Sequence, residues 1–257
     1  MFRIFRNDGR TLVLAMDHGG AADVHPGLAN PAKVLDDAVE AGVDAVLTTP
    51  GVVREFAGNL KTAGVILRVD GGTSDLRARP EYRLLATIED ALRLGVDAVA
   101  CMGFTGTSME VQTLENLSVV ARECHVWDMP LMAEMIPGGF IDPSLVTTEN
   151  VRLAARIGAE LGADIIKTEF VESGGSFRQV TEHCYRTVVV LGGGKRSEAD
   201  LFAMLRSAMD AGAAGAAIGR NIWGHAHPKA MVKAIGRIIH EGVSVAEALD
   251  ILATGSR

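Results

Sequence analysis

The stretch Ala163-Asp164-Ile165-Ile166-Lys167-Thr168-Glu169-Phe170 is a short apolar run that carries one lysine near its end. It directly follows Gly162, and a glycine at this place is the expected stop of a preceding helix. A short apolar run without polar alternation is typical of a parallel strand that is buried on both faces. An unpaired buried ammonium group is costly. We therefore expect the Lys167 amine to be paired with an acidic group or to be neutral at the end of this strand.

The same pattern recurs along the whole chain. Eight runs of this kind alternate with longer amphipathic segments, which predicts parallel strands joined by crossover helices. The strands are expected at residues 11–17, 44–49, 64–70, 97–102, 130–136, 164–170, 187–191 and 215–219. The helices are expected at about 31–41, 51–61, 87–94, 108–125, 147–161, 174–184, 197–211 and 228–241.

This repeat of about 30 residues favours a closed barrel over an open doubly wound sheet. The chain has 257 residues, the length that one (β/α)₈ TIM barrel needs. We therefore expect an α/β fold with a single barrel domain over residues 1–257 and an extra C-terminal helix at 244–253.

Composition limits the classes of partner. A formal net charge of -7 argues against nucleic acid, whose binding proteins carry clustered positive charge. Cys101, Cys124 and Cys184 show no metal-binding spacing, and the histidines are scattered, so we expect buried thiols, no metal and no cofactor. The N-terminus resembles no signal peptide and no apolar run is long enough to span a membrane, so we expect a cytoplasmic protein.

A barrel predicts where function lies, because active sites of this fold are built at the carboxyl ends of the strands. The polar residues expected at these ends are Asp17, His18, Thr48, Thr49, Arg68, Asp70, Glu134, Lys167, Glu169, the run 192–195 and Gly219-Arg220-Asn221. They are expected to converge on one mouth.

Lys167 is a candidate nucleophile. A lysine amine can condense with a ketone or aldehyde, and the resulting iminium ion is an electron sink for making or breaking a carbon-carbon bond. The alternative is a lysine that extends to the barrel rim and pairs with Glu169 or Asp17.

Acidic and basic neighbours supply the remaining candidates. Asp17 is the expected acid or base for a substrate hydroxyl, with His18 and Glu134 as further catalytic candidates. Arg68 and Glu169 are expected to contact substrate. The alternatives are a loop cap for Asp17, a loop hydrogen bond for His18, and a rim of internal salt bridges for the others.

Two glycine-bearing turns follow the seventh and eighth strands. Gly193 and Gly194 precede Lys195, and Gly219 precedes Arg220. Barrel enzymes hold a substrate phosphate at this place, because glycines let backbone N–H groups approach the anion and the cations add charge. We therefore expect a phosphate site, with ordinary tight turns as the alternative.

Four motifs together resemble a known family. Met16-Asp17-His18-Gly19, the strand with Lys167, the run Gly192-Gly193-Gly194-Lys195 and Gly219-Arg220-Asn221-Ile222 are similar to those of the archaeal-type class I fructose-bisphosphate aldolases. That superfamily includes the autoinducer-2 aldolase/thiolase and the aminodideoxyheptulosonate synthases. The resemblance implies a Schiff base on Lys167, Asp17 as acid/base partner, and phosphate binding by Gly193, Gly194, Gly219 and Arg220. It also implies a ring-based homo-oligomer, commonly a decamer.

One departure from the family affects the chemistry. Where the fructose-bisphosphate members have Tyr-Pro-Arg-Gly after the fifth strand, this chain has Ile136-Pro137-Gly138-Gly139. Isoleucine cannot transfer a proton, so a substitute such as Glu134, His18, Glu169 or water is needed.

Three hypotheses follow. The first is a metal-independent class I lyase that acts on a phosphorylated ketose or related keto compound through an imine on Lys167. The second keeps the imine but transfers an acyl or aldol group, as in the thiolase-like or heptulosonate-forming relatives. The third is a sugar-phosphate-binding barrel without catalysis.

Overall fold

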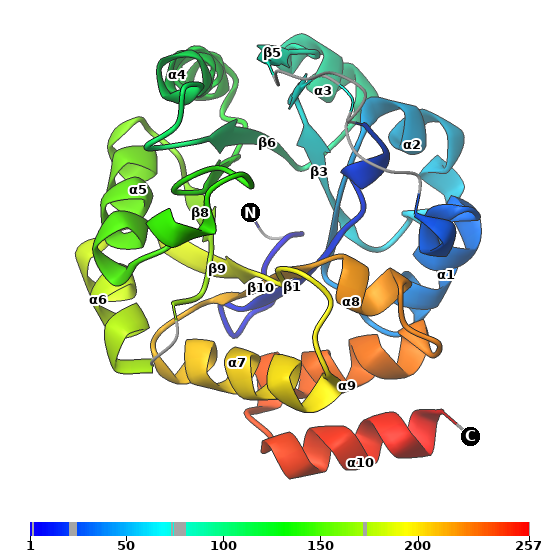
Figure 1. Ribbon diagram of the computed structural model, residues 1–257. Coiled ribbons are helices and arrows are strands. Elements are labelled where there is room, and N and C mark those ends of the chain that lie inside the picture. The colour runs from blue at the N-terminus through cyan, green and yellow to red at the C-terminus, as the bar shows by residue number, and fades with distance from the viewer. Residues whose placement is uncertain (2, 21–24, 73, 75–80, 172–173, 257) are drawn as a thin grey trace.

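The chain folds into a closed barrel of parallel strands surrounded by helices (Figure 1). A computed structural model describes residues 1, 3–20, 25–72, 74, 81–171 and 174–256. Within this described part, the strand order around the barrel is β1-β10-β9-β8-β7-β6-β3-β2. The strands are β1 Thr11–Ala15, β2 Ala45–Thr48, β3 Gly64–Arg68, β6 Ala98–Gly103, β7 Leu131–Met135, β8 Ile165–Thr168, β9 Thr187–Leu191 and β10 Gly215–Ile218. The predicted TIM barrel is confirmed.

The helices form a ring outside the strands, and α10 lies on the outer side of α9 (Figure 1). Their bounds are α1 Pro31–Glu40, α2 Pro50–Glu55, α3 Ile88–Leu94, α4 Glu110–Trp127, α5 Thr148–Glu160, α6 Gly174–His183, α7 Glu198–Asp210, α8 Arg220–Trp223, α9 Pro228–Glu241 and α10 Val245–Gly255. The expected C-terminal helix is therefore present. No helix in the described ranges is both long and apolar enough to cross a membrane.

Two local predictions differ from the structure. The helix expected at 51–61 is wrong in its second half, because α2 ends at Glu55 and a 3₁₀ turn, Ala57–Asn59, follows. A short antiparallel hairpin, β4 Asp70–Gly72 with β5 Tyr82–Leu84, was not predicted. Strands of three residues are too short to show a period of two in the sequence.

Aspartates at the starts of strands fix the register of the barrel. The Asp44 carboxylate accepts a hydrogen bond from the Leu12 N–H at 2.6 Å. Asp97 does the same for Val65 at 2.9 Å, and Asp164 for Leu131 at 3.0 Å. These side chains accept from N–H groups of the first or second residues of neighbouring strands, where the ladder would otherwise leave donors unpaired. The repeated Gly-x-Asp pattern is therefore structural.

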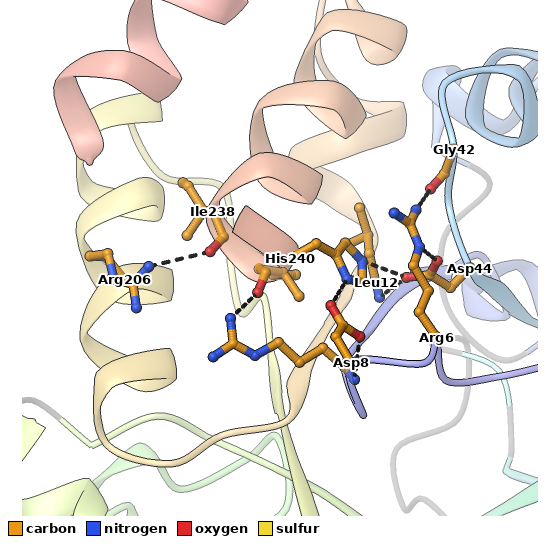
Figure 2. A network of polar contacts seen from close by, with 10 residues as sticks. Arg6, Asp8, Leu12, Gly42, Asp44, Arg206, Ile238 and His240 are labelled. Carbon is orange, nitrogen blue, oxygen red and sulfur yellow. Dashed lines mark hydrogen bonds and ion pairs between the residues drawn. The ribbon is translucent and has the colours of Figure 1, made fainter. Parts of the chain in front are cut away.

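The N-terminal segment closes the end of the barrel at which the strands begin. Ile4 is fully buried in the apolar cluster that fills the barrel interior, and Phe5 packs against that cluster. Figure 1 places the segment within the ring of strands. Nearby, His240 of α9 lies between Asp8 and Asp44, with ring-nitrogen to carboxylate distances of 2.8 and 2.9 Å (Figure 2). This end of the barrel is thus filled by apolar side chains and held by ion pairs. The opposite end is left for a substrate.

The cysteines agree with the expectation from the sequence. All three are free thiols in buried positions. Burial raises the pKa of Cys101 well above its usual range and that of Cys124 to about 12. A thiol held protonated in this way is a poor nucleophile.

Candidate active site

Strand alternation brings four charged side chains to one layer at the carboxyl ends of the strands. Because successive side chains point to opposite faces, residues two positions apart share the barrel interior. Four apolar residues of the packed interior are each followed, two positions later, by a charged residue. These pairs are Ala15 and Asp17, Ile66 and Arg68, Met132 and Glu134, and Ile165 and Lys167. The charged layer therefore rests directly on an apolar floor.

Lys167 lies deep in this layer. The residue is 5% exposed, and its Nζ is 2.7 Å from Glu134 Oε1. The two residues face each other in the register of β7 and β8. The alternative prediction, in which Lys167 extends to the rim and pairs with Glu169 or Asp17, is therefore wrong. The amine is buried, and its partner is Glu134. A buried amine beside a carboxylate has a neighbour that can take its proton.

Arg68 connects the carboxyl groups of the site. Its Nε is 2.9 Å from Asp17 Oδ2, its Nη1 is 3.4 Å from Asp70 Oδ1, and its Nη2 donates to Glu134 Oε2. Glu134 therefore bonds the guanidinium with one oxygen and Lys167 with the other. Substrate contact by Arg68 stays a prediction, whereas its hold on three carboxyl groups is a feature of the structure.

The charges of the site determine which carboxyl groups are ionised. Burial opposes ionisation of Asp17, but the positive charges of Arg68 and Lys167 outweigh it and lower its pKa. Burial likewise opposes ionisation of Glu134, and the charges of Lys167 and Arg68 lower its pKa. Burial raises the pKa of Asp70, although Arg68 and the Met102 N–H act against the rise. Asp17 and Glu134 are therefore carboxylates at neutral pH.

His18 lies at the edge of the same site. Its Nδ1 is 3.8 Å from Asp17 Oδ1, beyond hydrogen-bond range, and its ring meets that of Trp223 edge-on at 5.3 Å. This buried nitrogen has no hydrogen-bond partner within the described residues. Burial lowers the pKa of His18 although Asp17 opposes the effect, so the imidazole is neutral at neutral pH.

The predicted phosphate residues lie on two neighbouring loops. Gly193 has a φ of +66°, a conformation that favours glycine, and Gly194, Lys195 and Arg220 are exposed. A Cβ on Gly219 would lie 2.6 Å from the Ala15 carbonyl oxygen, so this turn requires a glycine. Two exposed cations, Lys195 and Arg220, therefore lie beside these turns.

Asn221, which the sequence placed at the mouth without a role of its own, holds the first of these loops in place. It is 4% exposed, and its Nδ2 donates to the carbonyls of Gly192 at 3.2 Å and Gly194 at 3.0 Å. Its Oδ1 accepts from the Arg196 N–H at 3.0 Å. In the sequence it was marked by its place after Arg220 at the end of the eighth strand.

Glu169 follows Lys167 by two positions, just beyond the end of β8 and at the border of the site. It is partly buried, and burial raises its pKa although the positive charge of Arg196 acts against the rise. No described contact joins it to Lys167, so its role toward a substrate stays a prediction.

A barrel with a buried lysine, two carboxylates and glycine-rich turns at one mouth defines the class of barrel aldolases. The chain belongs to the DeoC/LacD family of aldolases, whose pattern matches residues 11–225. It is therefore an enzyme of the aldolase type.

Individual relatives agree with this assignment. The chain is 37% identical over 251 residues to the 2-amino-3,7-dideoxy-D-threo-hept-6-ulosonate synthase 1 of Archaeoglobus fulgidus, covering 97% of this chain and 93% of that protein. An archaeal fructose 1,6-bisphosphate aldolase superposes with a TM-score of 0.86 at 28% identity, covering 93% and 97% of the two chains. A Schiff-base-forming fructose-1,6-bisphosphate aldolase superposes with a TM-score of 0.84 at 29% identity, also covering 93% and 97%.

Proposed function

We propose that the protein is a class I aldolase that forms an imine between Lys167 and a carbonyl substrate. The observation that supports this most is the buried Lys167 amine, 2.7 Å from a Glu134 carboxylate that Arg68 also holds. Glu134 takes the proton of the ammonium group, and the free amine attacks the carbonyl carbon. Asp17, ionised and bonded to Arg68, accepts the proton of a substrate hydroxyl while the carbon-carbon bond breaks. The reverse order of steps forms the bond.

The substrate class follows from the loops beside the site. Gly193 and Gly194 with Lys195, and Gly219 with Arg220, form two adjacent turns that carry exposed cations. Asn221 holds the first loop open in a fixed shape. We propose that these turns bind the phosphate group of a ketose or related keto compound, placing its carbonyl carbon over Lys167.

A second candidate keeps the imine but ends in group transfer, as in a heptulosonate-forming reaction. It is favoured by the 37% identity to the Archaeoglobus synthase. It is also favoured by Ile136, which stands where the bisphosphate aldolases have a tyrosine. Product that forms only when a second carbonyl compound is supplied would favour transfer, and coenzyme A-dependent product would favour the thiolase-like form. A barrel without catalysis is not retained, because the chain belongs to an aldolase family.

We also propose where the enzyme is located and that it is an oligomer. Resemblance to the class I aldolases supports a cytoplasmic homo-oligomer, for which light scattering after size exclusion gives the mass in solution.

Chemical trapping tests the imine. The protein is incubated with dihydroxyacetone phosphate and with fructose 1,6-bisphosphate, each with sodium borohydride, and the intact mass is measured. We expect a stable adduct that peptide mapping places on Lys167 and that Lys167→Met abolishes. Lys233→Met, which changes an exposed lysine of α9, is the matched control and should retain the adduct. No adduct with a broad panel of sugar phosphates would reject the proposal.

A further inference from the structure

The hairpin of β4 and β5 carries a tyrosine toward the charged layer. Tyr82 pairs with Gly72, and Leu84 pairs with Asp70. Residues directly opposite in an antiparallel pair, and residues two apart on one strand, share one face of the hairpin. Tyr82 is therefore on the same face as Asp70, whose carboxyl group reaches Arg68. A Cβ on Gly72 would lie 3.0 Å from Tyr82 Cε2, so the ring lies over the glycine.

An apolar cluster fixes the ring from its other side. Tyr82 packs against the cluster of Phe104, Met109 and Ile136, and its ring meets Phe104 edge-on at 4.8 Å. Ile136 follows Glu134 by two positions, so it lies on the barrel side of β7 directly above the site. Leu191 of β9 packs against the same cluster. The ring thus stands in a wall of the mouth, next to the isoleucine that cannot transfer a proton.

One step of imine formation needs a proton donor. Loss of water from the first adduct of an amine and a ketone requires an acid that protonates the departing hydroxyl group. In the resting site burial opposes ionisation of Asp17 and Glu134, but the charges of Arg68 and Lys167 outweigh it and lower the pKa of each. Glu134 carries a proton only after it has taken that of Lys167, and His18 is neutral because burial lowers its pKa. Arg68 keeps its proton, because Glu134, Asp17 and Asp70 outweigh its burial and raise its pKa.

We propose that the Tyr82 hydroxyl is the proton donor that dehydrates the adduct on Lys167, in the place where Ile136 removes such a group. This inference rests on the proposed imine chemistry. The phenol stays protonated at neutral pH, since burial and then the charge of Asp70 raise the pKa of Tyr82 to about 12. The ring shares its face of the hairpin with Asp70, whose carboxyl group bonds Arg68, and this geometry directs it toward the charged layer.

Dehydration converts the carbinolamine into the iminium ion with release of one water molecule. The carbinolamine carbon loses its hydroxyl group while the nitrogen lone pair forms the C=N bond, giving an iminium ion. The Tyr82 proton joins the departing hydroxyl oxygen, and water leaves. The resulting phenolate recovers a proton from solvent through the open mouth.

The chain offers a matched pair of variants, because it contains only two tyrosines. Tyr82→Phe keeps the ring and its contact with Phe104 but removes the hydroxyl group. Tyr185→Phe makes the same change at a residue that is 55% exposed and lies beside Arg156 on the outer surface. The probe is dihydroxyacetone phosphate, and the reductant is raised until the trapping rate no longer depends on its concentration, so that imine formation is limiting.

We expect Tyr82→Phe to slow formation of the trapped Lys167 adduct by about 10²-fold or more, the range of general acid catalysis. Affinity for dihydroxyacetone phosphate, measured by calorimetry, and the melting temperature should stay near those of the unmodified protein. Tyr185→Phe should trap at the unmodified rate. Trapping by Tyr82→Phe at that same rate would overturn the role of Tyr82 alone. Absence of any adduct in the unmodified protein would overturn the imine proposal and this inference together.

Discussion

At the scale of single residues, Arg68 is the group on which the site's charge balance depends. Its side chain is 6% exposed and bonds Asp17, Asp70 and Glu134. Removing one partner of a buried ion cluster leaves the others desolvated without compensation, at a cost of about 3–5 kcal/mol. We therefore expect Arg68→Met to lower the free energy of unfolding by about this amount, measured by urea denaturation at pH 7.

Acid pH should reduce that loss. The positive charges beside Asp17 and Glu134 outweigh burial and depress the pKa of both in the folded state, so their pairing stabilises above the ordinary carboxyl pKa of about 4. This contribution is lost as the pH falls through the folded-state pKa values. Arg156→Met, which removes an exposed pair with Glu160, should change stability by less than about 1 kcal/mol. A cost at Arg68 no larger than at Arg156 would contradict the argument.

At the scale of elements, the loop between β9 and α7 takes its shape from Asn221 of α8. Three hydrogen bonds join this side chain to the backbone of the loop at Gly192, Gly194 and Arg196. Asn221→Ala should let the loop adopt other shapes and so weaken the phosphate binding that we propose by about tenfold, equal to about 1.4 kcal/mol. Binding of inorganic phosphate and the KM for a phosphorylated substrate are the measurements.

Asn59→Ala is the control for that change. Asn59 bonds Asp36 on the helical exterior, far from the loop in sequence and not part of the site. Its loss should leave phosphate affinity unchanged. Equal phosphate affinity in Asn221→Ala and the unmodified protein would show that the loop keeps its shape without the asparagine.

The strands and their ends could be predicted because parallel strands are continuous apolar runs and because the barrel fixes where such strands end. This placed Asp17, Arg68, Glu134 and Lys167 at one mouth, as found. The bonding among them could not be predicted, because whether Lys167 meets Glu134, Asp17 or Glu169 depends on register and side-chain direction. The bonds of Asn221 to the loop and the place of Tyr82 on the hairpin could not be predicted either, since tertiary contacts leave no periodic signal.

At the scale of the whole molecule, His240 ties together parts of the chain that are far apart in sequence. The ring of His240, on α9, contacts Asp8 of the N-terminal segment through Nδ1 and Asp44 through Nε2 (Figure 2). Asp44 also accepts a hydrogen bond from the Leu12 N–H of β1. Burial alone would lower the pKa of His240, but the hydrogen bonds to Asp44 and Asp8 raise it. The protonated ring can donate to both carboxylates at once, whereas the neutral ring can donate to only one.

The sign of the pH dependence follows from that raised pKa. A group that binds its proton more tightly in the folded state stabilises fully below the unfolded pKa of about 6.5, and this contribution is lost as the pH rises through the folded pKa. We expect His240→Gln to lower the free energy of unfolding by about 1.5–3 kcal/mol at pH 6, the range for hydrogen bonds to charged groups. The difference from the unmodified protein should shrink at higher pH, in urea titrations run from pH 6 to pH 9. His125→Gln changes an exposed histidine of α4 and should leave the pH profile as it was. A His240→Gln deficit that stays constant over this range would mean that the ring acts by packing alone and that its proton does not stabilise the closed end of the barrel.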